Sequence, residues 1–88
     1  MSDPDDIRRR FLDIVADLWF VSADDLTNET AFTGALTNET DLVTDSMDMV
    51  ELMIACEDEF QVSISDEEAE EIRTIGQAVG FLLSKGAT

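Results

Sequence analysis

The 88-residue sequence contains no histidine, no tyrosine and a single cysteine, Cys56. Without histidine, neither a Ser-His nor a Cys-His nucleophile can be assembled, and zinc loses its usual nitrogen ligand. One cysteine supports no disulfide framework and no thiolate-rich metal site, and it fits a reducing, cytoplasmic location. Only carboxylates remain as general acids or bases, and so short a chain offers them a poor pocket. We therefore expect neither an enzyme nor a metal site.

Positive charge is also scarce, since five lysines and arginines face 21 aspartates and glutamates. The resulting net charge of −16 repels nucleic-acid phosphates and anionic lipid, so we expect no nucleic-acid partner and instead a basic protein surface. The segment from Glu39 to Glu71 holds 13 of the acids and no base. We expect this acidic segment to bind the basic surface of the partner. The alternative is a solvated surface that is kept charged for solubility.

Length and hydrophobic content fit one small folded domain that covers residues 1–88. Hydrophobic residues make up 44% of the chain, enough for a packed core rather than a disordered tail. No apolar run approaches the roughly 18 residues of a membrane span, and the acidic N-terminus is unlike a signal peptide. We expect a monomer without stable membrane insertion.

The N-terminal segment predicts an amphipathic helix that ends near Val21. Asp3 suits the capping position and Pro4 the first turn. Apolar residues then follow at helical spacing, namely Ile7, Phe11, Ile14, Val15 and Leu18. The run Arg8–Arg10 holds three of the five positive charges, and we expect it to form salt bridges with acids elsewhere in the domain.

A long loop is predicted from about residue 22 to residue 44. Within it, the pentapeptide Leu26–Thr30 recurs without change as Leu36–Thr40. One repeat is too little for a solenoid, so we interpret it as a local duplication. The loop is expected to be anchored to the core by Phe32, Leu36, Leu42 and Val43.

Three further helices are predicted after this loop. The longest begins after Asp45 and runs to Phe60. Residues 65–68 and 74–77 have the form of capping boxes, and they predict a short helix to about Ile72 and a final helix. No apolar alternation is long enough to predict a strand. The expected fold is all-α, a small four-helix bundle of three main helices and one short helix, with the long loop between the first two main helices.

The helix predicted to end at Phe60 has two apolar faces. At about 100° per residue, its core face collects Met49, Leu52, Met53, Cys56 and Phe60. We expect Cys56 to be a buried small hydrophobe rather than a reactive thiol. A second strip consists of Met47, Val50 and Ile54, among the acids Glu51, Glu57 and Asp58. An apolar strip ringed by one sign of charge is typical of a docking surface, and the alternative is a helix buried on two faces.

Ser46 stands at the predicted start of this helix, directly after Asp45. A helix N-terminus presents unpaired N–H groups and the positive end of the dipole, which suits a phosphate group. Because no histidine is present to activate it, we interpret Ser46 as an acceptor modified by another enzyme rather than as a catalyst. Asp45 would help to hold a divalent metal for that enzyme. The alternative is a first-turn serine beside an acidic cap.

Three parts of the sequence together resemble the acyl carrier proteins. They are Asp45-Ser46-Met47-Asp48-Met49-Val50-Glu51-Leu52, then Glu57-Asp58-Glu59-Phe60, then Ile64-Ser65-Asp66-Glu67-Glu68-Ala69-Glu70-Glu71-Ile72. The family motif is Asp-Ser-Leu followed by Asp-x-Val-Glu-Leu, a Glu-rich stretch that ends in Phe, and an Ile-Pro-Asp-Glu-like helix start. Agreement is dense from about Asp41 to Leu82, whereas the first helix matches in pattern only.

The resemblance implies a four-helix bundle in which Ser46 carries 4′-phosphopantetheine, donated from coenzyme A by a magnesium-dependent phosphopantetheinyl transferase. Acyl groups would be held as thioesters on the terminal sulfur and presented to ketosynthases, acyltransferases and other enzymes of fatty acid, polyketide or specialised lipid biosynthesis. The family's partner-recognition positions correspond here to Met47, Asp48, Val50, Glu51, Ile54, Glu57 and Asp58. Its acyl cavity would be lined by Phe32, Met53, Cys56 and Ile72.

Three departures from the family pattern favour a specialised carrier over the housekeeping one. Val43-Thr44-Asp45-Ser46 replaces the Gly-x-Asp-Ser of many members, Met47 replaces leucine, and the duplicated loop adds several residues. The alternative function is an acidic helical interaction module that binds a basic protein without being modified. A stand-alone hydrolase or transferase that uses Asp or Glu ranks behind both.

Overall fold

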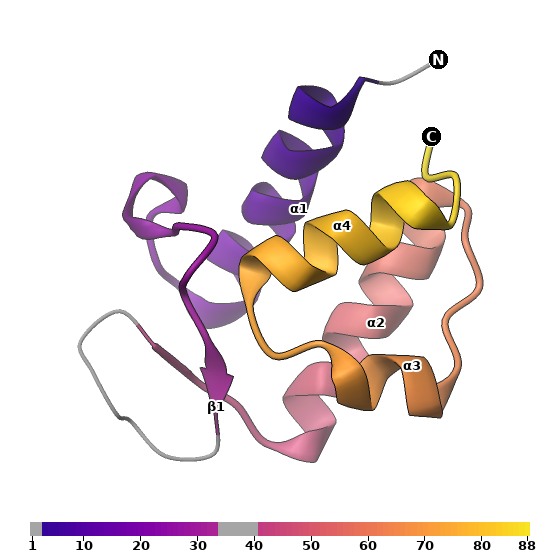
Figure 1. Ribbon diagram of the computed structural model, residues 1–88. Coiled ribbons are helices and arrows are strands. Elements are labelled where there is room, and N and C mark those ends of the chain that lie inside the picture. The colour runs from indigo at the N-terminus through magenta and orange to yellow at the C-terminus, as the bar shows by residue number, and fades with distance from the viewer. Residues whose placement is uncertain (1–2, 34–40) are drawn as a thin grey trace.

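The computed structural model describes residues 3–33 and 41–88 and shows a small bundle of helices (Figure 1). In chain order the elements are α1 (Pro4–Trp19), η1 (Ala23–Asp25), β1 (Phe32–Thr33), β2 (Leu42–Val43), α2 (Ser46–Phe60), α3 (Asp66–Glu71) and α4 (Ile75–Ser84). The three main helices and the short one confirm the all-α prediction. Within the described ranges, none of the helices has the length and apolar character needed to cross a membrane.

Helix α1 begins as its sequence predicts and ends earlier than expected. The side chain of Asp3 accepts a hydrogen bond from the N–H of Asp6 at 2.8 Å, and Pro4 occupies the first turn. The last helical residue is Trp19, two residues before the predicted end near Val21, because Phe20 adopts a left-handed conformation with φ of 56°. The apolar stripe faces the core, where Ile7, Phe11, Leu12 and Val15 are buried.

Strands β1 and β2 form a short parallel pair that the sequence does not predict. Phe32 is paired with Leu42 and Thr33 with Val43, and a two-residue strand is too short to show alternation. Leu42 is buried and Phe32 packs against the core, as expected of anchoring residues. The same expectation is wrong for Val43, which is 54% exposed, because successive side chains of a strand point to opposite sides.

The segment before β1 is held by backbone hydrogen bonds to the link between α3 and α4. The N–H of Phe32 donates to the carbonyl of Arg73, and the N–H of Ile75 donates to the carbonyl of Thr30. A side chain at Gly76 would lie 3.1 Å from Asn28, so the close approach favours glycine there. The first copy of the duplicated pentapeptide belongs to this segment. The second copy, Leu36–Thr40, lies outside the described residues, as does the anchoring role expected of Leu36.

The core is one cluster in which α1 packs against both α2 and α4. Its buried apolar residues are Ile7, Phe11, Leu12, Val15, Leu26, Leu42, Leu52, Met53, Cys56, Phe60, Ile72, Ile75, Ala78, Val79 and Leu82. Helix α3 has no buried residue of its own, and Figure 1 shows it below α4, beside the first turns of α2. The amphipathic pattern of the three long helices therefore accounts for most of the core.

Both predicted capping boxes are present in the second half of the chain. Ser65 and Glu68 exchange backbone and side-chain hydrogen bonds at the start of α3, and Thr74 and Gln77 do so at the start of α4. Lys85 ties the two helices together, because its ammonium group lies 2.7 Å from the carboxylate of Glu68. Local capping thus sets where the short helix begins, and an ion pair fixes it to α4.

Candidate functional site

Ser46 is the first residue of α2, and Asp45 caps that helix. The N–H of Asp48 donates to Oδ1 of Asp45 at 2.8 Å, and the N–H of Asp45 donates to Oδ2 of Asp48 at 3.1 Å. This reciprocal capping box directs both carboxylates to backbone groups. Ser46 is exposed, and among the described residues its hydroxyl has no hydrogen-bond partner. The hydroxyl is therefore accessible from solvent and available to react.

The exposed side of α2 carries the second apolar strip. Met47, Val50 and Ile54 are 64%, 47% and 59% exposed, so the helix is not buried on two faces. The core face is separate from this strip, and it contains Leu52, Met53, Cys56 and Phe60. Among the acids predicted for docking, Glu51 and Asp58 are exposed, while Asp48 and Glu57 are half-buried.

Glu57 has a structural contact that the sequence does not reveal. Its Oε2 accepts a hydrogen bond from the N–H of Ile64 at 2.9 Å, which fixes the link between α2 and α3. The two residues are seven positions apart and lie in different segments, so no helical spacing indicates the contact. Glu57 therefore contributes to the shape of the site as well as to its charge.

Two grooves meet at Ser46. The larger, of about 450 Å³, runs between α2 and α3 and includes Val50, Met53, Ile54 and Ile64. The smaller, of about 230 Å³, extends toward the strand pair and includes Phe32, Thr33, Thr44 and Ile72. Both are lined by Ser46, Met49, Ala69 and Glu70. Ser46 therefore lies where the two grooves join.

The four residues predicted to line an acyl cavity are divided by the structure. Met53 lines the larger groove, and Phe32 and Ile72 line the smaller one. Cys56 lines neither, because its side chain is fully buried in the core. Burial, reinforced by the nearby charges of Glu57 and Glu59, raises the pKa of the Cys56 thiol to about 12. Cys56 is thus an unreactive part of the core.

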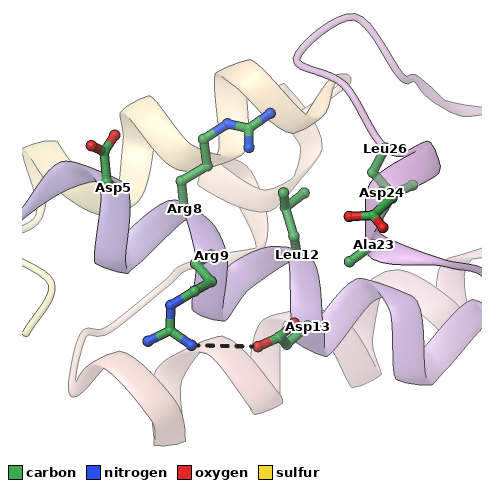
Figure 2. A pocket seen from close by; sticks show the side chains of 8 residues that line it. All are labelled: Asp5, Arg8, Arg9, Leu12, Asp13, Ala23, Asp24 and Leu26. Atoms are coloured by element: carbon green, nitrogen blue, oxygen red, sulfur yellow. Dashed lines mark ion pairs between the residues drawn. The ribbon is translucent and has the colours of Figure 1, made fainter.

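A third hollow, of about 540 Å³, lies between α1 and η1 and shares no lining residue with the Ser46 grooves. Figure 2 shows its mixed lining, in which the guanidinium of Arg9 reaches toward Asp13 at 3.8 Å. The remaining lining residues are Asp5, Arg8, Leu12, Ala23, Asp24 and Leu26. Its three carboxylates and two guanidiniums face solvent around two leucines. Nowhere in the described ranges do three or more His, Cys, Asp or Glu side chains gather to hold a metal ion.

Comparison with known proteins identifies the family. The family described as "phosphopantetheine attachment site" matches residues 9–82. Acyl carrier proteins from two strains of Porphyromonas gingivalis are each 38% identical over 77 residues, which cover 88% of this chain and 91% of theirs. Members of this family carry acyl groups and do not catalyse. The helical fold, the exposed Ser46 and these matches lead to one conclusion: the chain belongs to the acyl carrier protein family, and its cofactor is 4′-phosphopantetheine.

Proposed function

We propose that Ser46 is the attachment point of 4′-phosphopantetheine and that residues 1–88 act as one carrier domain. The observation that carries the proposal is the exposed Ser46 at the junction of two grooves, with a hydroxyl that has no hydrogen-bond partner within residues 3–33 and 41–88. The first-turn amides of α2 have no partner within the helix, and the positive end of the helix dipole favours a phosphodiester at this position. The group supplies a terminal thiol that holds acyl cargo as a thioester.

The loading reaction requires little of this chain beyond a positioned hydroxyl. Ser46 Oγ forms a bond to the phosphorus that bears the pantetheine, and the bond from that phosphorus to the bridging oxygen of coenzyme A breaks. Adenosine 3′,5′-bisphosphate leaves, and the serine proton passes to a base on the transferase. Asp45, adjacent to Ser46, is proposed to help hold the magnesium ion of the transferase, because hard cations prefer carboxylate oxygens.

The larger groove is proposed to shelter the acyl chain. Its apolar lining consists of Met49, Val50, Met53 and Ile54 on α2 and of Ile64 and Ala69 from the α3 side, together with polar residues such as Glu57 and Glu70. Apolar side chains on both walls favour a hydrocarbon over a polar cargo. The smaller groove, with Phe32 and Ile72, offers a second apolar wall next to the attachment point.

The exposed strip of α2 is proposed to dock basic partners, namely the phosphopantetheinyl transferase, ketosynthases and acyltransferases. Met47, Val50 and Ile54 supply the apolar contact, and Asp48, Glu51, Glu57 and Asp58 supply the charge. Acids around a small apolar patch mainly raise the association rate, which suits brief visits to successive enzymes. We place these enzymes in fatty acid, polyketide or specialised lipid biosynthesis, and the departures at Val43 and Met47 favour a specialised pathway.

Mass spectrometry of the intact protein tests the attachment. After incubation with coenzyme A, magnesium and a carrier-protein transferase, the wild type should gain the mass of one phosphopantetheinyl group, and Ser46→Ala should gain none. Ser63→Ala is the matched control, because Ser63 is also exposed and should leave loading unchanged. A wild-type chain that stays unmodified would contradict the proposal and return the acidic interaction module as the better function.

Charge reversal tests the docking surface. Glu51→Lys with Asp58→Lys should weaken binding to the transferase about tenfold at low salt, and the difference should shrink in about 1 M salt, where charges are screened beyond a few ångströms. Glu57 is left unchanged because it holds the Ile64 amide. Asp17→Lys with Glu29→Lys gives the same change in net charge on α1 and on the segment before β1. Equal binding by the two double variants would show that docking responds to net charge alone.

A further inference from the structure

Val43 is an exposed apolar residue that stands three positions before Ser46 in the chain. It is 54% exposed, whereas Leu42 before it and Thr44 after it are 5% and 8% exposed. Because consecutive Cα atoms are 3.8 Å apart, the Cα atoms of Val43 and Ser46 lie within about 11 Å of each other. The structure, over residues 3–33 and 41–88, leaves more than half of Val43 exposed.

The backbone of Val43 is held on both sides. Its pairing with Thr33 is closed by the hydrogen bond that the N–H of Thr44 donates to the Thr33 carbonyl at 2.7 Å. The indole N–H of Trp19 donates to the Val43 carbonyl at 3.0 Å. The Trp19 ring in turn packs against Phe32, with ring centroids 5.6 Å apart. Trp19 therefore acts as a positioning residue, and Val43 is presented in a fixed place before any partner arrives.

We infer that Val43 is a contact and specificity-determining residue for the phosphopantetheinyl transferase, an inference that depends on Ser46 being the attachment point. Transfer of the phosphopantetheinyl group requires the phosphorus of coenzyme A that bears the pantetheine to come within about 3.5 Å of Ser46 Oγ. The transferase must therefore cover the surroundings of that hydroxyl. Acyl-processing enzymes act at the far end of a long arm and have no such requirement. The transferase is the partner whose surface must meet Val43.

The surface around Ser46 indicates the chemistry of the matching transferase site. Met47, the residue after Ser46, is also apolar and is 64% exposed. The exposed carboxylate of Glu51 lies further along α2. A complementary enzyme surface has an apolar recess for Val43 and Met47 with basic groups beside it.

Steady-state loading kinetics with coenzyme A, magnesium and a carrier-protein transferase test the inference. Val43→Thr keeps the branched shape and the strand preference but places a hydroxyl in the recess, so KM for the carrier should rise about threefold or more with kcat unchanged. Leu83→Gln is the control, because Leu83 is 38% exposed near the end of α4, far from the start of α2 in Figure 1. Circular dichroism confirms that both variants are folded.

The possible results separate this inference from the proposed function. A rise in KM for Val43→Thr that Leu83→Gln does not share supports the contact. Three results overturn the proposed Val43 contact and leave Ser46 as the attachment point. They are a rise in KM of less than threefold, an equal rise in KM for both variants, and a loss of kcat at constant KM. A wild-type protein that gains no phosphopantetheine overturns both the contact and the attachment.

Discussion

Arg10 joins the first helix to the end of α2, and its replacement by methionine tests how much this contact stabilises the fold. The guanidinium donates to Oε2 of Glu59 at 2.6 Å and to the Glu59 carbonyl at 2.8 Å. It also lies 4.9 Å from the centre of the Phe60 ring, and its Nη1 lies 3.3 Å from Oδ2 of Asp6, a contact within α1 that Arg9 shares. The hydrogen bond to Glu59 is the main cause that raises the pKa of Arg10. Methionine keeps the apolar stem and removes these polar contacts.

The structure gives the size of the expected loss. Glu59 is 44% exposed, so the ion pair contributes only about 0.5–1 kcal/mol. The hydrogen bond to the last-turn carbonyl adds about 1 kcal/mol, and the contact with the Phe60 ring adds about 0.5–1 kcal/mol. The free energy of unfolding should therefore fall by about 2–3 kcal/mol, which lowers Tm by roughly 10–20 °C in a domain of this size.

Urea denaturation followed by the fluorescence of Trp19 measures this loss, with Arg9→Met as the matched control. Arg9 is 66% exposed and pairs with Asp6 and Asp13 of its own helix. Its replacement makes the same change in net charge, so the repulsion of an acidic chain affects both variants equally. We expect Arg9→Met to lower the free energy of unfolding by well under half as much as Arg10→Met does. Equal losses would show that general charge, and not the link between α1 and α2, explains the effect.

Two further predictions concern Glu68 and Cys56. The pKa of Glu68 is lowered mainly by the hydrogen bond from Lys85 and then by the one from the Ser65 amide. The ionised carboxylate therefore stabilises the fold above its usual pKa of 4.5. This stabilisation is lost as pH falls through the lowered pKa. Glu68→Gln should therefore flatten the acid limb of stability against pH, and an unchanged slope would contradict this. The buried Cys56 thiol, with its pKa of about 12, should resist a thiol reagent at pH 8 until the protein is unfolded, and rapid labelling of the native protein would contradict its burial.

Helix positions were predictable because the relevant interactions are local. Asp3, Asp45, Ser65 and Thr74 each cap a helix in the structure, and each side chain bonds a backbone N–H three residues ahead. The exposed strip of α2 follows equally directly from the geometry of 3.6 residues per turn. The position of a residue in the sequence of a helix is enough to predict on which face of the helix its side chain lies.

Contacts between distant segments were not predictable in this way. Nothing in the local sequence indicates that the Glu57 carboxylate holds the Ile64 amide or that the Trp19 indole holds the Val43 carbonyl. The local sequence does not indicate the strand pair either. Strands of two residues form by pairing with each other and are too short to show an alternation of apolar and polar residues. Glu57 and Ile64 both line the larger groove, so its shape depends on a contact that the local sequence does not reveal.

The sequence by itself determined the helices, the acidic surface and the serine at the start of α2, since local capping and helical periodicity are encoded within a few neighbouring residues. Only the tertiary structure decided that two grooves meet at that serine and that Val43 faces outward rather than into the core. The physical reason is that a groove exists only between segments that pack together, and the outward direction of one side chain depends on which neighbours fill the other face.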